Sequence, residues 1–432
     1  MLYYSTNNKS PKVNFKEATI KGQAPDKGLY FPETIPSLEK TFFEDINEYS
    51  KEEIALKVIR PYVGDVIPEN ELQRIVSETV SFDFPLVKVD SNIFSLELFH
   101  GPTLAFKDVG ARFMSRCLGY FVKNNGKKIT VLVATSGDTG GAVANGFYDV
   151  DGVDVVILYP AGKVSSVQEL QLTTLGKNIK ALEVDGTFDD CQQLVKQAFA
   201  DELLNEKLFL TSANSINVAR WLSQQFYYFF AYQQWEDKKN PPVISVPSGN
   251  FGNICAGLLA HHSGLPVKHF IAACNANDVV TEYLKTENYA PKKSVATISN
   301  AMDVGNPSNF VRILQLFNQE FQSLKNVMSS YTFSDEETRN IIKEVFKNEN
   351  YLLDPHGAVG YGALKKYVSQ HEKESGIFLE TAHPVKFYDV VEPIIQQKIA
   401  LPAVVNDLLT RKKESVKMGV KYEELRDYLF AR

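Results

Sequence analysis

The sequence predicts an α/β protein with two doubly wound parallel-sheet domains and an N-terminal helical appendage. The chain has 432 residues, 44% of them hydrophobic, which is enough for two or three domains with sizeable cores. Between residues 81 and 390, short apolar runs alternate with helix-like stretches, as in strand–helix–strand units whose strands lie parallel. Glycine-rich turns follow two of these runs.

The expected strands are spaced along the chain, and helical stretches follow most of them. They are the runs near 129–135, 154–160, 179–184, 208–213, 242–247, 269–274 and 376–380. In open parallel sheets, ligands bind beyond the carboxyl ends of the strands. We therefore expect functional residues in the turns that follow these runs.

Chain order suggests three segments. Residues 1–80 are expected to form the helical appendage, in which Ser50 and Glu53 have the spacing of a capping box. Residues 81–390 are expected to form the two-lobed α/β core, and residues 391–432 a C-terminal helical segment. No internal repeat or low-complexity linker marks the boundary between the two lobes.

Lys107 is a candidate nucleophile because of its apolar surroundings. It follows the apolar run 104–106 within the glycine- and proline-containing segment 98–108, just before a helix-like stretch. Lysines are rarely buried, so a solvated surface position is the simplest interpretation of any single one. Burial here would disfavour the ammonium form, and a neutral amine can condense with an aldehyde to a Schiff base.

The two glycine-rich turns are candidate anion sites. One is the segment 135–141 after the first apolar run, and the other is the segment 247–253 after the run near 242–247. Such turns leave backbone N–H groups at a helix N-terminus, where the helix dipole is positive. Each could also be an ordinary helix start capped by Asp138 or Ser248. Together with Lys107, they suggest a phosphorylated aldehyde cofactor and an anionic substrate.

A nucleotide-binding alternative fails on spacing. Gly162-Lys163 is followed by Val164 and lacks the upstream glycine of a phosphate-binding loop. Neither glycine-rich turn contains the dinucleotide fingerprint.

Seven segments, in order, resemble those of the threonine synthases, which are pyridoxal-phosphate enzymes of fold type II. They are GPTLAFKD, ATSGDTGGAVA, TSANSINVARW, VPSGNFGN, SNAMDVGNPSNF, DPHGAVGYGAL and LETAHPVKF. The resemblance covers most of the chain. It implies a tryptophan synthase β-like fold, pyridoxal 5′-phosphate as cofactor, and conversion of O-phospho-L-homoserine and water to L-threonine and phosphate by γ-elimination and β-replacement.

The resemblance assigns the cofactor-binding residues. Lys107 would carry the cofactor as an imine, and Thr381 would face the pyridine nitrogen. A hydroxyl there makes the ring a weaker electron sink than a carboxylate would, which favours elimination and replacement over transamination. Taken alone, Thr381 would be a β-branched residue that ends a strand. The cofactor phosphate would be held by Ser248, Gly249, Asn250, Phe251, Gly252 and Asn253.

The resemblance also implies a second site, for the substrate phosphate and carboxylate. Arg220 could equally be a helix-surface arginine and Lys163 a solvated loop lysine. The partner of Asp138 is not predicted. The phosphate candidates are Thr135, Thr139, Asn214, Arg220 and Lys163, the carboxylate candidates are Ser136 and Gly137, and Asp138 lies in the same turn.

Two alternative functions remain. Another fold-type-II lyase, such as a serine/threonine dehydratase, is disfavoured by Asn214 and Arg220, although a phospho-amino-acid phospholyase would also need a phosphate site. A cofactor-free binding protein of the same fold is disfavoured by Lys107 and Thr381. His356 and His383 are interpreted as helix-start residues without a catalytic role.

Composition limits the partners and the compartment. The net charge of −6 argues against nucleic acid, and no apolar run approaches the length that spans a membrane. The start of the chain lacks a signal-peptide core. Four cysteines, far apart in the sequence, predict reduced thiols in a cytoplasm, with neither a disulfide framework nor a metal cluster. The oligomeric state is not predicted.

Overall fold

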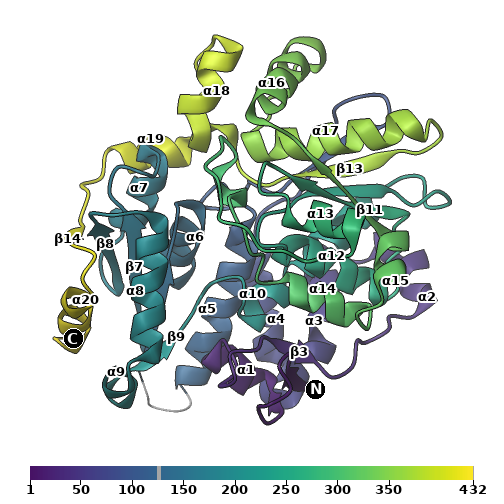
Figure 1. The fold of residues 1–432 in the computed structure, drawn as a ribbon. Coiled ribbons are helices and arrows are strands. Elements are labelled where there is room, and N and C mark those ends of the chain that lie inside the picture. The colour runs from purple at the N-terminus through teal and green to yellow at the C-terminus, as the bar shows by residue number, and fades with distance from the viewer. Residues whose placement is uncertain (124–127, 432) are drawn as a thin grey trace. The chain divides into compact units, whose positions relative to one another are not determined.

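The computed structural model describes residues 1–123 and 128–431, and its chain divides into two compact units (Figure 1). Unit 1 comprises Met1, residues 31–106 and residues 221–399. Unit 2 comprises residues 2–30, 107–220 and 400–432. Each unit is built around its own parallel sheet, so the predicted α/β class is confirmed.

Unit 2 contains a five-stranded sheet of order β14-β8-β7-β6-β9 in which every neighbouring pair is parallel. Its central strands are buried along most of their length, which explains why they appear in the sequence as continuous apolar runs. The strands are β6 (Ile129–Ala134), β7 (Val153–Pro160), β8 (Ile179–Val184), β9 (Phe209–Thr211) and β14 (Val416–Met418).

Helices cover the sheet of unit 2. Leu132, Leu158 and Leu182 of neighbouring strands pack with Leu194 of α8 and Leu425 of α20. Helices α5, α6 and α7 pack against one another in sequence and against β7 and β8. The helices of unit 2 are α1 (Phe15–Lys21), α5 (Lys107–Lys123), α6 (Asp138–Phe147), α7 (Ser166–Thr173), α8 (Phe188–Ala200), α9 (Glu202–Lys207), α19 (Ala403–Leu409) and α20 (Tyr422–Phe430), and α10 (Val218–Leu222) begins in this unit.

Unit 1 contains a six-stranded sheet of order β12-β11-β10-β13-β5-β4. All neighbouring pairs are parallel except the edge pair β4 and β5, which is antiparallel. The strands are β4 (Leu86–Lys88), β5 (Ile93–Glu97), β10 (Val243–Pro247), β11 (His269–Cys274), β12 (Met328–Thr332) and β13 (Gly376–Glu380).

Two helices of unit 1, α12 (Gly252–His262) and α17 (Pro355–Gln370), cover opposite faces of this sheet. The Ser245 hydroxyl on β10 donates to the Gly360 carbonyl of α17 at 2.7 Å. Phe270 of β11 contacts Gly257 of α12. Ser245 is in register with Ile271, whose strand neighbour Phe270 points to the other face, so the sheet is doubly wound.

The remaining helices of unit 1 surround this sheet. They are α2 (Lys40–Glu44), α3 (Lys51–Val63), α4 (Glu69–Thr79), α11 (Gln225–Gln234), α13 (Val279–Thr286), α14 (Phe310–Leu316), α15 (Phe321–Val327), α16 (Asp335–Glu349) and α18 (Tyr388–Ile395), with short 3-10 turns η1 (Ile46–Glu48), η2 (Gly64–Val66), η3 (Asn300–Met302) and η4 (Pro384–Phe387).

The first 80 residues do not form one purely helical body. They include the small strands β1 (Leu2–Ser5), β2 (Val13–Asn14) and β3 (Tyr30–Pro32), and the first part of the segment belongs to unit 2. The reason is aromatic packing, because Phe15 of α1 contacts Tyr3 and also Phe113 of α5. The predicted capping box of Ser50 and Glu53 is present at the start of α3.

The C-terminal segment also differs from the purely helical prediction. Strand β14 lies between α19 and α20 and pairs in parallel with β8. Just before β14, the Lys413 ammonium lies 2.7 Å from Glu169 and 2.9 Å from Glu183. These ion pairs fix the segment along the edge of the unit 2 sheet.

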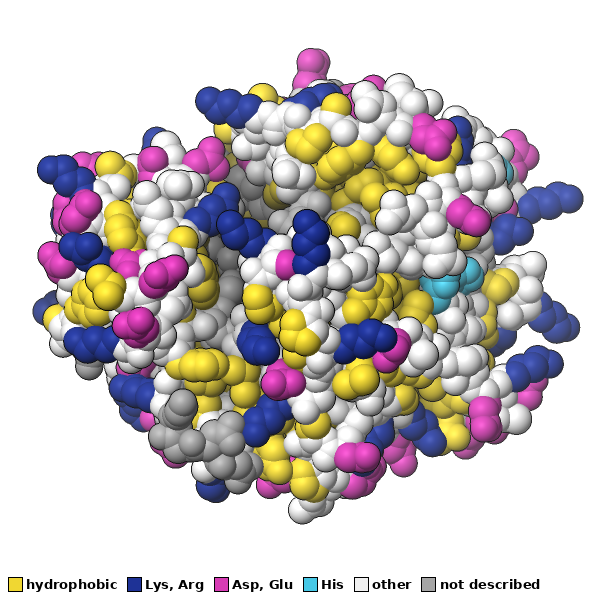
Figure 2. All heavy atoms as spheres, turned by 60° about the horizontal axis from the view of Figure 1, so that its bottom comes forward, with side chains coloured by type: hydrophobic (Ala, Val, Ile, Leu, Met, Phe, Trp, Pro, Cys, Tyr) yellow, Lys and Arg dark blue, Asp and Glu magenta, His cyan; other side chains and the backbone are white. Residues whose placement is uncertain are grey.

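The surface is mixed in charge. On the face drawn in Figure 2, Lys and Arg side chains are interspersed with Asp and Glu. None of the helices in the described ranges has the length and apolarity needed to cross a membrane.

Candidate active site

Lys107 is the first residue of α5 and, as predicted, it is largely buried. Its side chain is 16% exposed, and its Nζ lies 3.8 Å from Asp138 Oδ2 at the start of α6. The other carboxylate oxygen of Asp138 accepts a hydrogen bond from Gln168 Nε2 at 2.9 Å. The apolar neighbours Leu104, Ala105 and Val109 are buried as expected, but a buried carboxylate also faces the amine and favours its charged form.

The turn before α6 is stabilised by one of its own side chains, that of Thr135. The buried Thr135 hydroxyl accepts hydrogen bonds from the N–H groups of Gly137 at 2.9 Å and Gly140 at 2.8 Å. Gly137 has φ +134°, and an added Cβ would lie 2.5 Å from the Gln168 side chain, so this position requires glycine. Ser136 and Thr139 are partly exposed beside the turn.

Arg220 is buried, which contradicts the interpretation of a helix-surface arginine. Arg220 is only 3% exposed, and its Nη1 donates a hydrogen bond to the Ala213 carbonyl. An added Cβ at Gly110 of α5 would lie 2.8 Å from the Arg220 carbonyl oxygen, so α5 packs directly on this residue. Asn214 is partly exposed, and its carbonyl accepts from the Asn217 N–H at 3.1 Å.

Three of the predicted substrate-binding segments follow neighbouring strands of unit 2. The turn 135–139 follows β6, Lys163 follows β7, and Asn214 follows β9. Because these strands are parallel, the three segments lie at the same edge of the sheet. Lys163 is exposed, as the solvated-loop interpretation expected.

In unit 1, the glycine-rich turn connects β10 to α12. Phe251 is the N-cap of α12 with φ +60°, and in the described part of the chain no side chain caps the first turn. An added Cβ at Gly249 would lie 2.6 Å from Met302 Cα, so the turn is pressed against that backbone. The first N–H groups of a helix need partners from outside the helix, so this turn suits a phosphate.

Polar side chains of the same turn fix its shape. Asn253 donates to the Pro247 carbonyl at 2.7 Å, and the buried Ser248 hydroxyl donates to the Val246 carbonyl at 2.8 Å. The Asn250 side chain accepts from the Ser308 N–H at 2.6 Å.

Thr381 lies at the end of β13 and is 6% exposed. Its carbonyl accepts a hydrogen bond from the Phe106 N–H at 2.9 Å. Phe106 immediately precedes Lys107, and its own carbonyl accepts from the Tyr227 hydroxyl. The end of β13 is thus fixed to the residue one peptide bond before the candidate nucleophile.

The two histidines have the expected helix-start positions. His356 lies in the first turn of α17, and His383 is the N-cap of η4, where its Nδ1 accepts from the Val385 N–H at 3.1 Å. Burial, followed by the neighbouring His100, lowers the pKa of His383 to about 4, so this ring is neutral near pH 7.

The sequence analysis missed two buried carboxyl groups near Thr381. Glu380 ends β13 and Asp354 caps α17, and both are fully buried. A signal was available, because Asp354-Pro355 is a typical helix start and Glu380 is a charged residue at the end of an apolar run.

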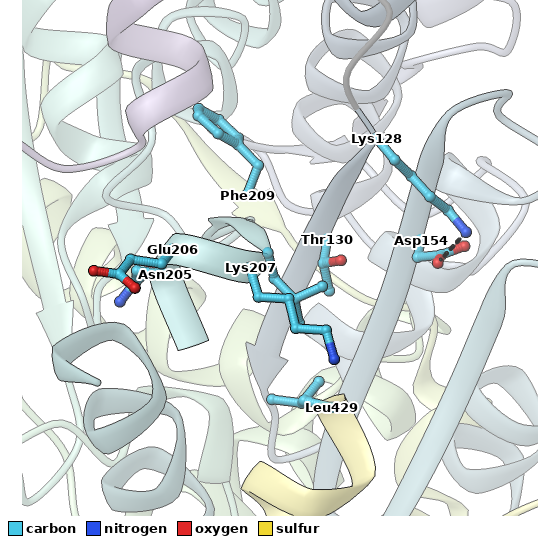
Figure 3. Close-up of a pocket in the computed structure, with 9 residues that line it drawn as sticks. Lys128, Thr130, Asp154, Asn205, Glu206, Lys207, Phe209 and Leu429 are labelled. Carbon is cyan, nitrogen blue, oxygen red and sulfur yellow. Dashed lines mark ion pairs between the residues drawn. The ribbon is translucent and has the colours of Figure 1, made fainter. Parts of the chain in front are cut away.

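Unit 2 also contains a separate hollow (Figure 3). Its lining includes Lys128, Thr130 and Phe209, which lie at or near the amino ends of β6 and β9. Lys128 is paired with Asp154 at 2.6 Å across this hollow. The hollow is therefore at the opposite edge of the unit 2 sheet from the turn at 135–139.

Comparison with known proteins matches this arrangement to a class of enzymes. Residues 83–379 match the family described as pyridoxal-phosphate dependent enzymes. Maize serine racemase, at 16% identity and a TM-score of 0.56, shares the fold. The chain therefore has the fold of the pyridoxal-phosphate-dependent enzymes and uses that cofactor.

Closer relatives identify the family within this class. Residues 2–80 and 357–429 match the N-terminal and C-terminal regions of threonine synthases. The threonine synthase of Haemophilus influenzae is 44% identical over 99% of both chains. The crystal structure of threonine synthase from Escherichia coli has a TM-score of 0.93 at 42% identity and full coverage of both chains. A pyridoxal-phosphate-bound threonine synthase from Brucella melitensis has a TM-score of 0.92 at 36% identity, covering 99% of this chain and 98% of that one. The chain belongs to the threonine synthase family.

We expect Gly249→Ala to weaken binding of pyridoxal phosphate. The added methyl would collide with the Met302 backbone, and overpacking of about 1–3 kcal/mol corresponds to roughly fivefold to 150-fold in affinity. Titration of cofactor-free protein, followed by absorbance, measures this. Gly119→Ala is the control, because its methyl would meet only the Val150 side chain, at 3.0 Å. Unchanged affinity in Gly249→Ala would exclude this turn as the phosphate site.

Proposed function

We propose that this chain converts O-phospho-L-homoserine and water to L-threonine and inorganic phosphate. The observation that carries the proposal is a full-length relationship to threonine synthases in a chain that retains the buried Lys107. The fold and the matching family are those of pyridoxal-phosphate enzymes. The residues that are candidates for binding a substrate phosphate lie at one edge of the unit 2 sheet, which suits a phosphorylated substrate. The test is release of phosphate from phosphohomoserine together with detection of threonine, which a phospholyase or a dehydratase would not form.

The residues of the chain suit the cofactor. Lys107 supplies an amine for its aldehyde, the first turn of α12 supplies backbone N–H groups for its phosphate, and Thr381 supplies a hydroxyl for its ring nitrogen. The phosphate-binding residues in this proposal are Ser248, Gly249, Asn250, Phe251, Gly252 and Asn253. When bound, the cofactor supplies the electron sink for carbanion chemistry at the substrate.

Lys107 is the proposed proton carrier. Once the substrate amine has displaced it, its Nζ is free to accept and return protons at the substrate Cα and Cβ. Asp138, 3.8 Å away, favours the ammonium form and so holds a proton at Nζ between transfers. Gln168 donates a hydrogen bond of 2.9 Å to the Asp138 carboxylate, so this carboxylate is oriented before substrate binds.

The substrate anions are assigned to unit 2. We propose that Thr139, Asn214, Arg220 and the exposed Lys163 bind the γ-phosphate and that Ser136 and Gly137 bind the carboxylate. Thr135 is proposed for the phosphate as well, and its hydroxyl also holds the turn in shape.

We propose the cytoplasm as the location of this enzyme. All four cysteines are free thiols, and all are buried. Disulfides are rare where glutathione and thioredoxin keep thiols reduced. A small-molecule substrate, with neither nucleic acid nor membrane as partner, agrees with the mixed surface charge and the net charge of −6.

Borohydride reduction of the holoenzyme should attach pyridoxal phosphate to Lys107, because a reduced cofactor–lysine bond is stable to proteolysis. Mass spectrometry of the labelled peptide identifies the residue. Lys163→Ala serves as a control and should leave the label in place. A label on any other lysine would exclude Lys107 as the nucleophile.

Arg220→Ala should lower kcat/KM for phosphohomoserine while cofactor content stays near that of the wild type. A hydrogen bond to a charged group contributes about 1.5–3 kcal/mol, or roughly tenfold to 150-fold. Part of the loss should appear in kcat if the guanidinium stabilises the leaving phosphate. Because Arg220 is buried, circular dichroism and thermal unfolding accompany the kinetics, and Arg220→Lys retains the charge. Wild-type kinetics in both folded variants would contradict the assignment.

A further inference from the structure

A network of buried polar groups lies directly behind Thr381, and the proposed mechanism does not use it. Glu380 is fully buried, and its Oε1 accepts the Asp354 N–H at 2.7 Å. In the part of the chain that the structure describes, its Oε2 is buried without a hydrogen-bond partner. A Cβ at Gly357 would overlap this oxygen, so the carboxyl group packs on the first turn of α17.

The Asp354 carboxylate is the hydrogen-bond acceptor at the centre of the network. Its Oδ1 accepts from the His356 N–H at 2.7 Å and lies 2.5 Å from His356 Nδ1. His356 Nε2 accepts the Ala301 N–H at 3.2 Å, so the ring proton is on Nδ1 and points to Asp354. The N–H of Gly357 also points to this carboxylate, at 3.4 Å. The His356 N–H, the His356 ring and the Gly357 N–H all donate to the Asp354 carboxylate, an arrangement that is typical of an acidic helix N-cap.

Glu380 has the opposite environment. Burial raises the pKa of Glu380 well above 4.5, and the charges of Asp354 and Glu97 raise it further. Two adjacent buried carboxyl groups do not both ionise, so a proton stays on Glu380.

Among the described residues, the charged groups that act most strongly on Glu380 are the carboxyl groups of Asp354 and Glu97. Glu97 on the neighbouring strand β5 is bonded to His100 at 2.7 Å and accepts the Tyr351 hydroxyl at 2.9 Å. Burial, together with the charge of Glu97, raises the pKa of Tyr351 well above 10, so this hydroxyl remains neutral. His383, as described above, is neutral near pH 7.

The network connects two proposed cofactor-binding elements of unit 1. At one end, Glu380 is joined by a peptide bond to Thr381. At the other end, His356 binds the Ala301 N–H, and Ala301 precedes Met302, whose backbone supports Gly249 of the phosphate turn. A change in the shape of this network would therefore reach both the ring-nitrogen hydroxyl and the phosphate turn.

We propose that Glu380 acts as a neutral carboxylic acid that positions the Thr381 hydroxyl and, through Asp354 and His356, the backbone behind Gly249. Glu380 is a positioning residue and touches neither cofactor nor substrate. This proposal rests on the roles proposed above for Thr381 and the phosphate turn.

The first test uses the protonation state, in cofactor-free protein. A glutamine at position 380 can accept the Asp354 N–H through its carbonyl oxygen, and like a protonated glutamate it carries no charge. Above pH 4.5 the unfolded wild type releases a proton that the folded wild type keeps, so stability falls as pH rises. Glu380→Gln has no such proton, so its Tm relative to wild type should rise from about pH 5 to about pH 8. Glu336→Gln, at an exposed position in the first turn of α16, is the control and should show no such trend.

The second test measures positioning through the absorption spectrum and affinity of pyridoxal phosphate. Glu380→Ala leaves the buried Asp354 N–H without its acceptor, so the dissociation constant should rise by about tenfold and the absorption maximum should shift. In Glu380→Gln, the dissociation constant and the absorption maximum should both be near the wild-type values. A recovery of overall stability alone would not restore the absorption maximum, which reports on the surroundings of the ring nitrogen.

Several outcomes would overturn this proposal. A Tm difference between Glu380→Gln and wild type that is flat or falls with pH means that Glu380 is ionised. Equal damage by glutamine and alanine also excludes a neutral acid. A wild-type spectrum and affinity in Glu380→Ala would leave the proton assignment intact but remove the positioning role. Failure of the proposed function itself would appear separately, as a borohydride label away from Lys107 with the pH trend of Tm unchanged.

Discussion

The hydrogen bond between the Phe106 N–H and the Thr381 carbonyl is the constraint on which the candidate site depends. It fixes the end of β13, a central strand of unit 1, to the residue that precedes Lys107. The Ala105–Ala382 bridge and the bond from the His383 N–H to the Leu104 carbonyl continue the same ladder. The backbone at Thr381, the proposed ring-nitrogen ligand, is thereby fixed to the backbone of Phe106 within unit 1.

Polar groups stabilise this part of the protein by completing hydrogen bonds that burial would otherwise leave unmade. Thr135 and Asn253 each use their own side chains to fix a glycine-rich turn, and Lys386, which is fully buried, donates to the Thr103 carbonyl at 2.9 Å. Such bonds add only about 1 kcal/mol each, whereas leaving a buried partner unsatisfied costs about 1–3 kcal/mol. The buried polar groups therefore determine shape more than they add stability.

Much of the fold could be predicted from the sequence, because strands buried on both faces are continuous apolar runs. All seven predicted runs contain strands, from β6 to β13. Two of the missed strands, β12 and β14, lack that signal. β12 has the sequence Met-Ser-Ser-Tyr-Thr and lies at a sheet edge, where one side has no partner strand and polar residues are tolerated. β14 pairs with β8, which precedes it by more than two hundred residues, and no local pattern indicates such a partner.

The sequence by itself determined which chemistry the chain carries, because that depends on local order: a lysine after an apolar run, and glycine-rich turns between strands and helices. Only the tertiary structure decided how these groups are tuned. It placed Asp138 against Lys107, buried Arg220 beneath α5, and paired Glu380 with Asp354 at the start of α17. These pairs join residues far apart in the chain, and both the charge of a carboxyl group and the state of an amine depend on distance and burial. Neither quantity is set before the sheets form and bring the ends of their strands together.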